Sequence, residues 1–368
     1  MNIVIINSIL RTSEKGIIPQ CKSIKDSLLY NYALAFYNQG HNVTLIAAKD
    51  FMPDELEVYP YSIIFLESNL KWLFKPDLIP LHLKLFKYLL HNKNNIDLVI
   101  SSEVFQLNSL IAALCIDKKK IIFWQEMAVH QKKFFKLPSL IWHNVIAKLF
   151  LKDILVVPRS ERAYFFIKNY LAHVSQTLVG HGIALEKFTA NTKKEDYFIS
   201  VARLVPGKNI DSIIKKFDEF IKSDTKFSHY KLLIAGGGEE LDNLVSLVSQ
   251  LSINNSVIFC GQLSHHELNN WLGKSKCLLI NTLKDNVALI VSEAIATGTP
   301  ILSNSVIHND YIINNNNLGI AKSDWNYLDI IKIIENNNNY VENCIKYQEK
   351  VSFDYYAELM LEVFNEEK

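Results

Sequence analysis

Two acidic residues in one apolar segment carry the clearest chemical signal in the sequence. Residues 284–300 read KDNVALIVSEAIATGTP, which places Asp285 and Glu293 eight positions apart. Eight residues of helix rise about 12 Å, roughly the reach from a sugar ring to the ribose of a bound nucleotide sugar. A carboxylate accepts hydrogen bonds from neighbouring hydroxyls, and one without a partner is costly to bury. Glu293 is therefore expected to bind a ligand, whereas Asp285 could also be a simple helix N-cap.

Two basic residues surround a turn earlier in the chain. In VARLVPGKNIDSII, Arg203 and Lys208 flank a Pro-Gly turn between a predicted strand at 197–203 and a predicted helix at 209–223. Cations at such a turn suit a diphosphate, whose negative charge grows when it departs. The alternative is a pair of solvated surface charges, and the acidic pair further along the chain favours the diphosphate.

A glycine-rich turn follows the next predicted strand. In IAGGGEELDNL, Gly236, Gly237 and Gly238 separate a strand from a helix, as in dinucleotide-binding loops. Leu241 occupies the position at which the GxGxxG pattern needs its third glycine. The pattern therefore indicates a structural turn that approaches a ligand closely, and it argues against an NAD-dependent oxidoreductase.

Together these segments resemble glycosyltransferase family 4, whose members are retaining enzymes with the GT-B fold. The resemblance lies mainly in residues 180–320. It includes the linker 181–188, HGIALEKF, where His181 stands in place of the family's usual asparagine. The family's first acid is usually Glu, so Asp285 is one methylene shorter, which leaves the identity of the sugar open.

The resemblance implies roles for individual residues. Arg203 and Lys208 would bind the donor diphosphate, Glu293 would bind the ribose hydroxyls, and Asp285 would bind the transferred sugar. Of these, Arg203, Lys208 and Asp285 are the predicted catalytic residues. The further predicted donor-binding residues are Asn286, Val287, Ala288, Leu289, Gly237 and Gly238.

The N-terminal half departs from the family's pattern. Where members usually carry a Gly-Gly pair after the first strand, this chain has only Gly16. At the end of the predicted strand IIFWQE, Gln125 holds the position of a common family histidine. Gln125 can still hydrogen-bond a sugar hydroxyl, but it cannot carry charge. The residues predicted for the acceptor or sugar side are Gly16, Glu103, Gln125, Glu126 and His181.

Short β-branched runs alternate with helical patterns along the chain, which predicts an α/β protein with parallel sheets covered on both faces. Two rounds of this alternation predict two Rossmann-like, doubly wound domains facing a central cleft, where ligands bind at the carboxyl ends of the strands. The predicted domains are 1–185 for the acceptor and 186–350 for the nucleotide sugar. The helix in 351–368 either packs within the second domain or crosses back to the first. The asparagine runs 314–317 and 336–339 are interpreted as loops or as compositional bias without a function.

Composition excludes several classes of protein. The formal net charge is +1, which argues against general nucleic-acid binding. The five cysteines are scattered without a CxxC pair, which favours reduced thiols in the cytoplasm. In SHHEL, 264–268, the spacing does not match a zinc motif, so no metal site is predicted. No apolar run reaches the ~18–20 residues that span a bilayer, and the apolar first residues are typical of a strand rather than a signal peptide.

The first half of the chain is basic and contains an unusual aromatic segment. Residues 1–175 hold 21 Lys and Arg against 14 Asp and Glu. Within 130–152, lysines 132, 133, 136, 148 and 152 alternate with aromatic residues, and 69–76, NLKWLFKP, is similar. Such a helix could lie at an anionic membrane surface, or it could pack on the core with a solvated basic face. Both interpretations stay open.

The resemblance and the residues together predict a retaining glycosyltransferase with no obligatory metal cofactor. It would move a hexose-type unit from a nucleotide sugar, with UDP favoured over GDP, to a glycan or lipid-linked acceptor in bacterial-type surface polysaccharide or glycoconjugate synthesis. It would be cytoplasmic, at or near the inner face of the membrane. The alternatives are a nucleotide-sugar epimerase of similar fold and a catalytically weak subunit that binds a sugar nucleotide.

Overall fold

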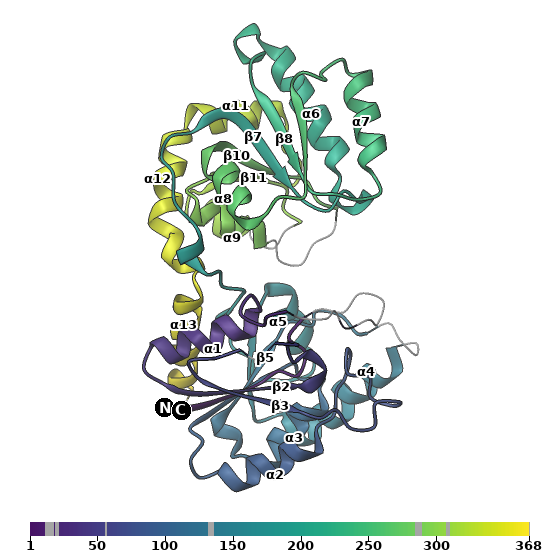
Figure 1. Cartoon of the computed structure of the whole chain (residues 1–368), viewed down its shortest axis with the longest axis vertical. Coiled ribbons are helices and arrows are strands. Elements are labelled where there is room, and N and C mark those ends of the chain that lie inside the picture. The colour runs from purple at the N-terminus through teal and green to yellow at the C-terminus, as the bar shows by residue number, and fades with distance from the viewer. Residues whose placement is uncertain are drawn as a thin grey trace. The chain divides into compact units, whose positions relative to one another are not determined.

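The computed structural model of the chain (Figure 1) describes residues 1–11, 18, 22–55, 57–131, 136–283, 289–306 and 310–367. The chain divides into two compact units. The first comprises Met1–Gly182 together with Phe353–Lys368, and the second comprises Ile183–Ser352.

The first unit is built on a six-stranded parallel sheet in the order β3-β2-β1-β4-β5-β6. Its central strand β1 pairs with β2 on one side, where Ile3 aligns with Val43, and with β4 on the other, where Ile3 aligns with Leu98. The central strands are apolar on both faces because helices cover both. The strands are β1 Asn2–Ile6, β2 Asn42–Ala48, β3 Ser62–Leu66, β4 Leu98–Ser102, β5 Ile121–Gln125 and β6 Leu155–Pro158.

Two layers of helices cover the first sheet (Figure 1). The helices α1 Leu28–Asn38 and α13 Phe353–Glu366 pack with Ile3 and Ile5 of β1, which point to one face. The opposite face, carrying Val4 and Ile6, is covered by α2, α3 and η4. The remaining bounds are α2 Leu83–Asn92, α3 Leu107–Cys115, α4 Leu137–Ile141, η4 Trp142–Leu151, α5 Glu161–Lys168, η1 Lys49–Phe51 and η2 Lys118–Lys120. The helix α4 continues directly into η4, which is π-helical.

The second unit repeats the plan with the strand order β12-β11-β10-β7-β8-β9, and every pairing is parallel. Its strands are β7 Glu195–Val201, β8 Lys231–Ala235, β9 Val257–Gly261, β10 Ser275–Ile280, β11 Ile301–Ser303 and β12 Gly319–Ala321. Its helices are α6 Ile210–Ser223, α7 Leu241–Gln250, α8 His265–Lys274, α9 Leu289–Ala296, α10 Asp310–Asn315, α11 Tyr327–Glu335 and α12 Asn337–Tyr347. Short 3₁₀ turns are η5 Leu185–Lys187, η6 Pro206–Lys208, η7 Thr225–Phe227 and η8 Gln348–Val351.

The predicted class of two doubly wound α/β sheets is confirmed. One local prediction is wrong: the asparagine run 336–339 is not a loop, because Asn336 ends α11 and Asn337 begins α12. Asn337 is buried there and donates to the carbonyl of Lys276 at 2.8 Å. The run 314–317 is only partly a loop, since its first two residues end α10. Among the described helices, none is long and apolar enough to cross a bilayer.

Candidate functional site

Two turns meet at the carboxyl edge of the second sheet. The turn η6 follows β7, and the segment after β10 lies against it because β10 and β7 are neighbouring strands. The carbonyl of Gly207 accepts hydrogen bonds from Thr282 Oγ1 at 3.0 Å and from the N–H of Leu283 at 2.9 Å. Asn281 adds a bond to Ser212 Oγ of α6 at 2.8 Å. The chain therefore enters segment 284–288 directly beside the Pro-Gly turn.

The two predicted cations belong to this same edge. Arg203 is exposed and Lys208 is half-buried. The residue that follows Lys208, Asn209, has a left-handed backbone with φ 53° and starts α6. This places Lys208 at the junction of the turn with a helix N-terminus, where the helix dipole is positive and favours an anion.

The glycine turn after β8 packs against the backbone of residues 202–204. A Cβ on Gly236 would lie 1.9 Å from the carbonyl oxygen of Ala202, and one on Gly238 would lie 2.2 Å from that of Leu204. The N–H of Leu204 donates to the carbonyl of Gly237 at 2.9 Å. The predicted close approach is thus explained by the chain itself, because Gly236 and Gly238 let the turn touch the segment that carries Arg203. Gly237 has open space, with Gln262 its nearest neighbour at 3.9 Å.

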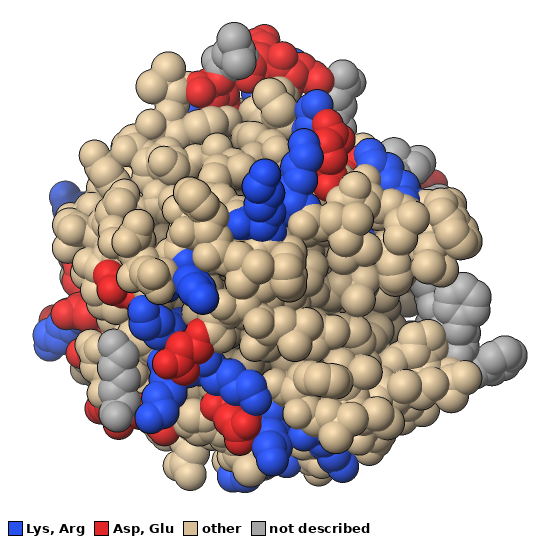
Figure 2. Space-filling model, turned by 90° about the horizontal axis from the view of Figure 1, so that it is seen from below, with Lys and Arg blue, Asp and Glu red and all other residues tan. Residues whose placement is uncertain are grey.

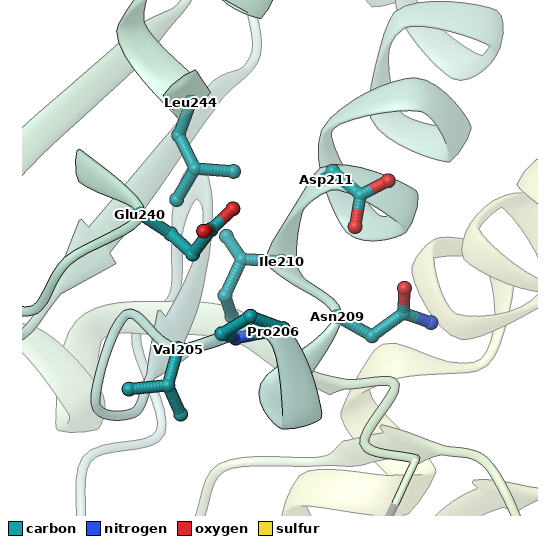
Figure 3. A pocket seen from close by; sticks show the side chains of 7 residues that line it. All are labelled: Val205, Pro206, Asn209, Ile210, Asp211, Glu240 and Leu244. Carbon is teal, nitrogen blue, oxygen red and sulfur yellow. The ribbon is translucent and has the colours of Figure 1, made fainter. Parts of the chain in front are cut away.

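A small hollow lies beside the turn, and it does not suit a diphosphate. Figure 3 shows the carboxylate groups of Asp211 and Glu240 at its edge, and these would repel phosphate oxygens. The empty space, including open solvent, is about 200 Å³, below the roughly 300–1,000 Å³ of ordinary small-molecule sites. Its lining residues are Val205, Pro206, Asn209, Ile210, Asp211, Glu240 and Leu244.

Glu293 projects from α9 at the half-exposed side of a buried helix. Its neighbours Val291, Ala294 and Ile295 are buried, while Glu293 itself is half-buried. Burial raises the pKa of its carboxyl group, and the nearby His265 opposes that rise only in part. Among the described residues, no hydrogen bond to this carboxylate is found. The role of this carboxylate in binding a ligand stays a prediction.

Four predicted donor-site residues cannot be placed against Glu293. Asp285, Asn286, Val287 and Ala288 lie outside the described residues, so the separation of the two acids remains a prediction. Leu289, the first residue of α9, is 46% exposed.

Lys194, a half-buried residue that was not predicted to be a site residue, supports the C-terminal end of α9. Gly298 ends the helix with φ 67°, and the N–H of Thr299 donates back to the carbonyl of Ala294 at 2.7 Å. Lys194 Nζ donates to the carbonyl of Gly273 at 2.6 Å and to Thr299 Oγ1 at 3.2 Å. Burial lowers the pKa of Lys194 to about 7. Lys194 thus joins the end of α8 to the connection between α9 and β11.

A second charged cluster lies at the carboxyl edge of the first sheet. Glu103, Glu126 and Arg159 each directly follow a strand, namely β4, β5 and β6, which are adjacent in the sheet. Arg159 Nη1 pairs with Glu126 Oε2 at 2.7 Å, and Nη2 donates to Ser102 Oγ at 3.2 Å. Its guanidinium group lies 3.7 Å from the centre of the Trp124 ring. The side chain of Arg159 is 3% exposed, whereas half of the Glu126 side chain is exposed. The buried guanidinium group of Arg159 therefore holds the accessible carboxylate of Glu126 in place.

The two acids of this cluster differ in their affinity for protons. Glu103 has a left-handed backbone, φ 67°, and its carboxylate accepts the N–H groups of Glu126 at 2.9 Å and Met127 at 3.1 Å. Burial nevertheless raises the pKa of Glu103 to about 7, and the neighbouring Glu126 adds to the rise. Burial also raises the pKa of Glu126, but interaction with His181 and the charge of Arg159 outweigh it and lower that pKa to about 2.

Gln125 does not present its amide to a ligand in this structure. The side chain is fully buried. Its Oε1 accepts the N–H of Val104 at 3.0 Å and its Nε2 donates to the carbonyl of Met127 at 2.9 Å. This corrects the expectation that Gln125 hydrogen-bonds a sugar hydroxyl, because both of its polar atoms are already used by the backbone. Gln125 braces the turn from which Glu126 projects.

The remaining predicted residues of the first unit have different outcomes. His181 Nε2 lies 3.7 Å from Glu126 Oε1, so His181 joins the cluster. Gly16 lies outside the described residues. Arg159 and Ser102 were missed by sequence reasoning, although Arg159 had the same signal as Glu103 and Glu126, a charged residue directly after a buried strand.

Two further features of the chain are its potential metal ligands and its cysteines. No group of three or more His, Cys, Asp or Glu side chains suited to a metal ion occurs in the described part of the chain. Cys115, Cys260, Cys277 and Cys344 are free thiols.

Comparison with known proteins bears on the second unit above all. Residues 184–351 match the family described as Glycosyl transferases group 1, and these residues coincide with nearly all of the second unit. The alpha-monoglucosyldiacylglycerol synthase of Streptococcus pneumoniae is 26% identical over 48% of this chain and 42% of its own length. The O-antigen chain mannosyltransferase RfbU of Salmonella typhimurium is 22% identical over 62% of this chain and 66% of its own length. The chain thus spans less than two thirds of either relative.

Solved structures agree with the fold of the chain. HepE of Anabaena, solved in complex with UDP, matches with a TM-score of 0.66 at 12% identity, covering 100% of both chains. A glycosyltransferase from Rickettsia africae matches with a TM-score of 0.65 at 14% identity, covering 100% of this chain and 98% of its own. At this level of identity the likeness concerns the fold alone, and it identifies the paired doubly wound sheets as those of the GT-B fold.

Proposed function

We propose that this protein is a glycosyltransferase that takes a sugar from a nucleotide donor and transfers it to a glycan or lipid-linked acceptor. The observation that carries the proposal is the family match, which falls on the second unit. In this unit the Arg203–Lys208 turn, the glycine turn and residues 281–283 after β10 meet at one sheet edge. A UDP-sugar is the favoured donor, and the UDP complex of the Anabaena neighbour supports this choice.

In the proposed mechanism the second unit binds the donor. Arg203 and Lys208 contact the diphosphate and stabilise the charge that develops on it when the bond to the sugar breaks. Because these cations act at the leaving group, no metal ion is required. Glu293 accepts hydrogen bonds from the ribose hydroxyls, and Asp285 accepts them from the transferred sugar. Residues 286–289 are proposed to complete the donor site.

The first unit supplies the acceptor side. Glu126 is the accessible acid of the Arg159 cluster, and its low pKa keeps it ionised and able to accept hydrogen bonds from acceptor hydroxyls near neutral pH. The new bond forms on the face from which the diphosphate leaves, which retains the configuration at the sugar carbon. The free thiols among the described cysteines support a reducing compartment, the cytoplasm. The acceptor belongs to surface polysaccharide or glycoconjugate synthesis.

Two alternatives are distinguished by the same assay. An epimerase would convert a UDP-sugar in the absence of any acceptor, and a catalytically weak subunit would bind the donor without turnover. The relatives named above are a synthase of a glycosylated lipid and a mannosyltransferase, and neither name favours epimerisation.

A donor panel tests the proposal. The purified chain is incubated with UDP- and GDP-sugars carrying a radiolabelled sugar, with and without a membrane extract as a source of acceptor. We expect free nucleoside diphosphate and label in a glycan or lipid product with one donor. Epimerised donor, or tight donor binding without any release of diphosphate, would overturn the proposal in favour of the corresponding alternative.

A further inference from the structure

Three helices of the first unit form one layer over the sheet. The contacts of α3 with α2 and with η4 place the three helices side by side, as Figure 1 also shows. Their inner residues, including Leu85, Leu89, Ala112 and Ala147, are fully buried in a common core with the sheet. The opposite sides of these helices therefore face away from the sheet.

The outward side of this layer is unusually apolar. Leu83, Phe86 and Leu90 are exposed along α2 at helical spacing. Val145 and Leu149 are exposed along η4, where Leu149 is 64% accessible. Trp72, in the segment that leads into α2, is 80% exposed. Single exposed apolar residues are ordinary on a protein surface, but rows of them on neighbouring helices mark a surface that binds something.

Lysines accompany these apolar rows, and acids are scarce. Lys84 and Lys87 are exposed on α2, and Lys148 is exposed on η4. Neither α2, α3 nor the segment 136–152 contains an Asp or Glu. Acids close in sequence to these elements are Asp77, before α2, and the exposed Asp117, after α3. Asp50 pairs with Lys71 at 2.6 Å, and Asp153 pairs with Lys118 at 3.0 Å. Figure 2 shows this side, with a broad area at its centre and right that carries neither acidic nor basic side chains, and with Lys and Arg among Asp and Glu around it.

We propose that this docking face, the outward side of α2, α3 and η4 with the Trp72 segment, lies on an anionic lipid bilayer. A layer that combines exposed leucine, phenylalanine and tryptophan with lysine and no acid suits the boundary between acyl chains and acidic headgroups. Tryptophan is favoured at that boundary, and lysine can bury its carbon chain while its ammonium group reaches the headgroups. The inference rests on unit 1 alone and does not depend on the donor site.

The charge arm of the test is a vesicle co-sedimentation assay. The full chain is mixed with vesicles of phosphatidylcholine alone or with added phosphatidylglycerol. We expect binding only to the anionic vesicles, and we expect Lys84→Glu/Lys87→Glu to lower the partition coefficient about tenfold or more. The matched control is Lys226→Glu/Lys346→Glu, which makes the same charge change at exposed positions of the second unit. The control should bind as the unaltered chain does.

The apolar arm removes side chains without changing charge. Trp72→Gln/Leu149→Gln should also weaken binding about tenfold or more, whereas Val245→Gln/Leu328→Gln, at exposed positions of the second unit, should not. Cooperative thermal unfolding of each variant without any ligand reports that it is folded and keeps the donor site separate from this test.

Several outcomes would overturn the docking proposal. These are no binding to either vesicle, equal binding to neutral and anionic vesicles, or equal losses in a variant and its control. Self-association that Trp72→Gln/Leu149→Gln abolishes, without vesicle binding, would reassign the face to a second copy of the chain.

Discussion

At the scale of single residues, Glu293 tests how the donor is held. Glu293→Gln keeps the shape of the side chain but removes its charge, so hydrogen bonds from the ribose hydroxyls weaken by about 1–2 kcal/mol. We expect the donor KM to rise about tenfold with little change in kcat, since ribose contacts are the same in ground and transition states. Steady-state kinetics with varied donor measures this. Glu342→Gln, at an exposed position of α12, is the control, and an unchanged donor KM in Glu293→Gln would remove the ribose role.

Arg159 is expected to act through Glu126. Arg159→Lys retains a positive charge but loses the two-pronged geometry and the contact with Trp124. Glu126 should then lose its fixed orientation. We expect acceptor kcat/KM to fall about tenfold, corresponding to roughly 1.4 kcal/mol, while the donor KM stays constant and serves as the internal control. Equal changes in donor and acceptor constants would indicate a general disturbance of the fold instead.

Glu103 should make stability depend on pH. Its folded pKa, about 7, lies above the ordinary value of 4.5, so the folded state holds a proton that the unfolded state has released. Stability therefore falls as pH rises from about 4.5 to about 7. In Glu103→Gln this decline should be smaller by about 1–3 kcal/mol. Denaturant unfolding at a series of pH values measures the difference, and parallel pH curves for variant and unaltered chain would contradict it.

Strand ends explain which site residues the sequence could reveal. Glu103 and Glu126 could be selected because charged residues directly after buried strands must lie at one sheet edge. Arg159 satisfies the same rule but was not predicted to be a site residue. The burial of Gln125 could not be foreseen, because it depends on hydrogen bonds to Val104 and Met127 that form only when β4 and β5 pair.

At the scale of elements, the glycine turn should be intolerant of side chains. In Gly238→Ala the new Cβ would lie 2.2 Å from a backbone oxygen, at a residue with φ 159°. We expect a loss of about 1–3 kcal/mol in the free energy of unfolding. Gly207→Ala is the control, since no atom lies within 4 Å of its Cβ position, and it should change stability by less than about 1 kcal/mol. Denaturant unfolding compares the two, and equal losses would refute the packing argument.

Most elements could be predicted because apolar runs of five to seven residues alternate with helical patterns. The strand β3 was not predicted from the sequence, since it is an edge strand whose middle residues are only half-buried. The asparagine run at 336–339 was interpreted as a loop because asparagine has a local preference for turns. In the structure, Asn337 is buried and donates a hydrogen bond to the carbonyl of Lys276. Tertiary contacts, absent from local propensity, decided both cases.

At the scale of the whole molecule, the last helix of the chain belongs to the first unit. After the second unit, α13 places Ala357, Met360, Val363 and Phe364 in the core of the first, against α1. The sequence left open whether this helix stays with the second unit, because its apolar face fits any core. Two segments therefore join the units, at residues 182–183 and 352–353. Because residues 353–368 add five acids and one lysine, the first unit holds 22 Lys and Arg against 19 Asp and Glu.

The turn that carries Arg203 and Lys208 is proposed to bind the diphosphate of a nucleotide sugar. The most direct measurement is the rise in unfolding temperature caused by one fixed concentration of a UDP-sugar, because a ligand that binds only the folded state stabilises it by an amount that grows with the ratio of its concentration to its Kd. We predict a clear rise for the unaltered chain and for the control Lys226→Ala, and its near loss in Lys208→Ala. An equal rise in all three proteins would contradict the account.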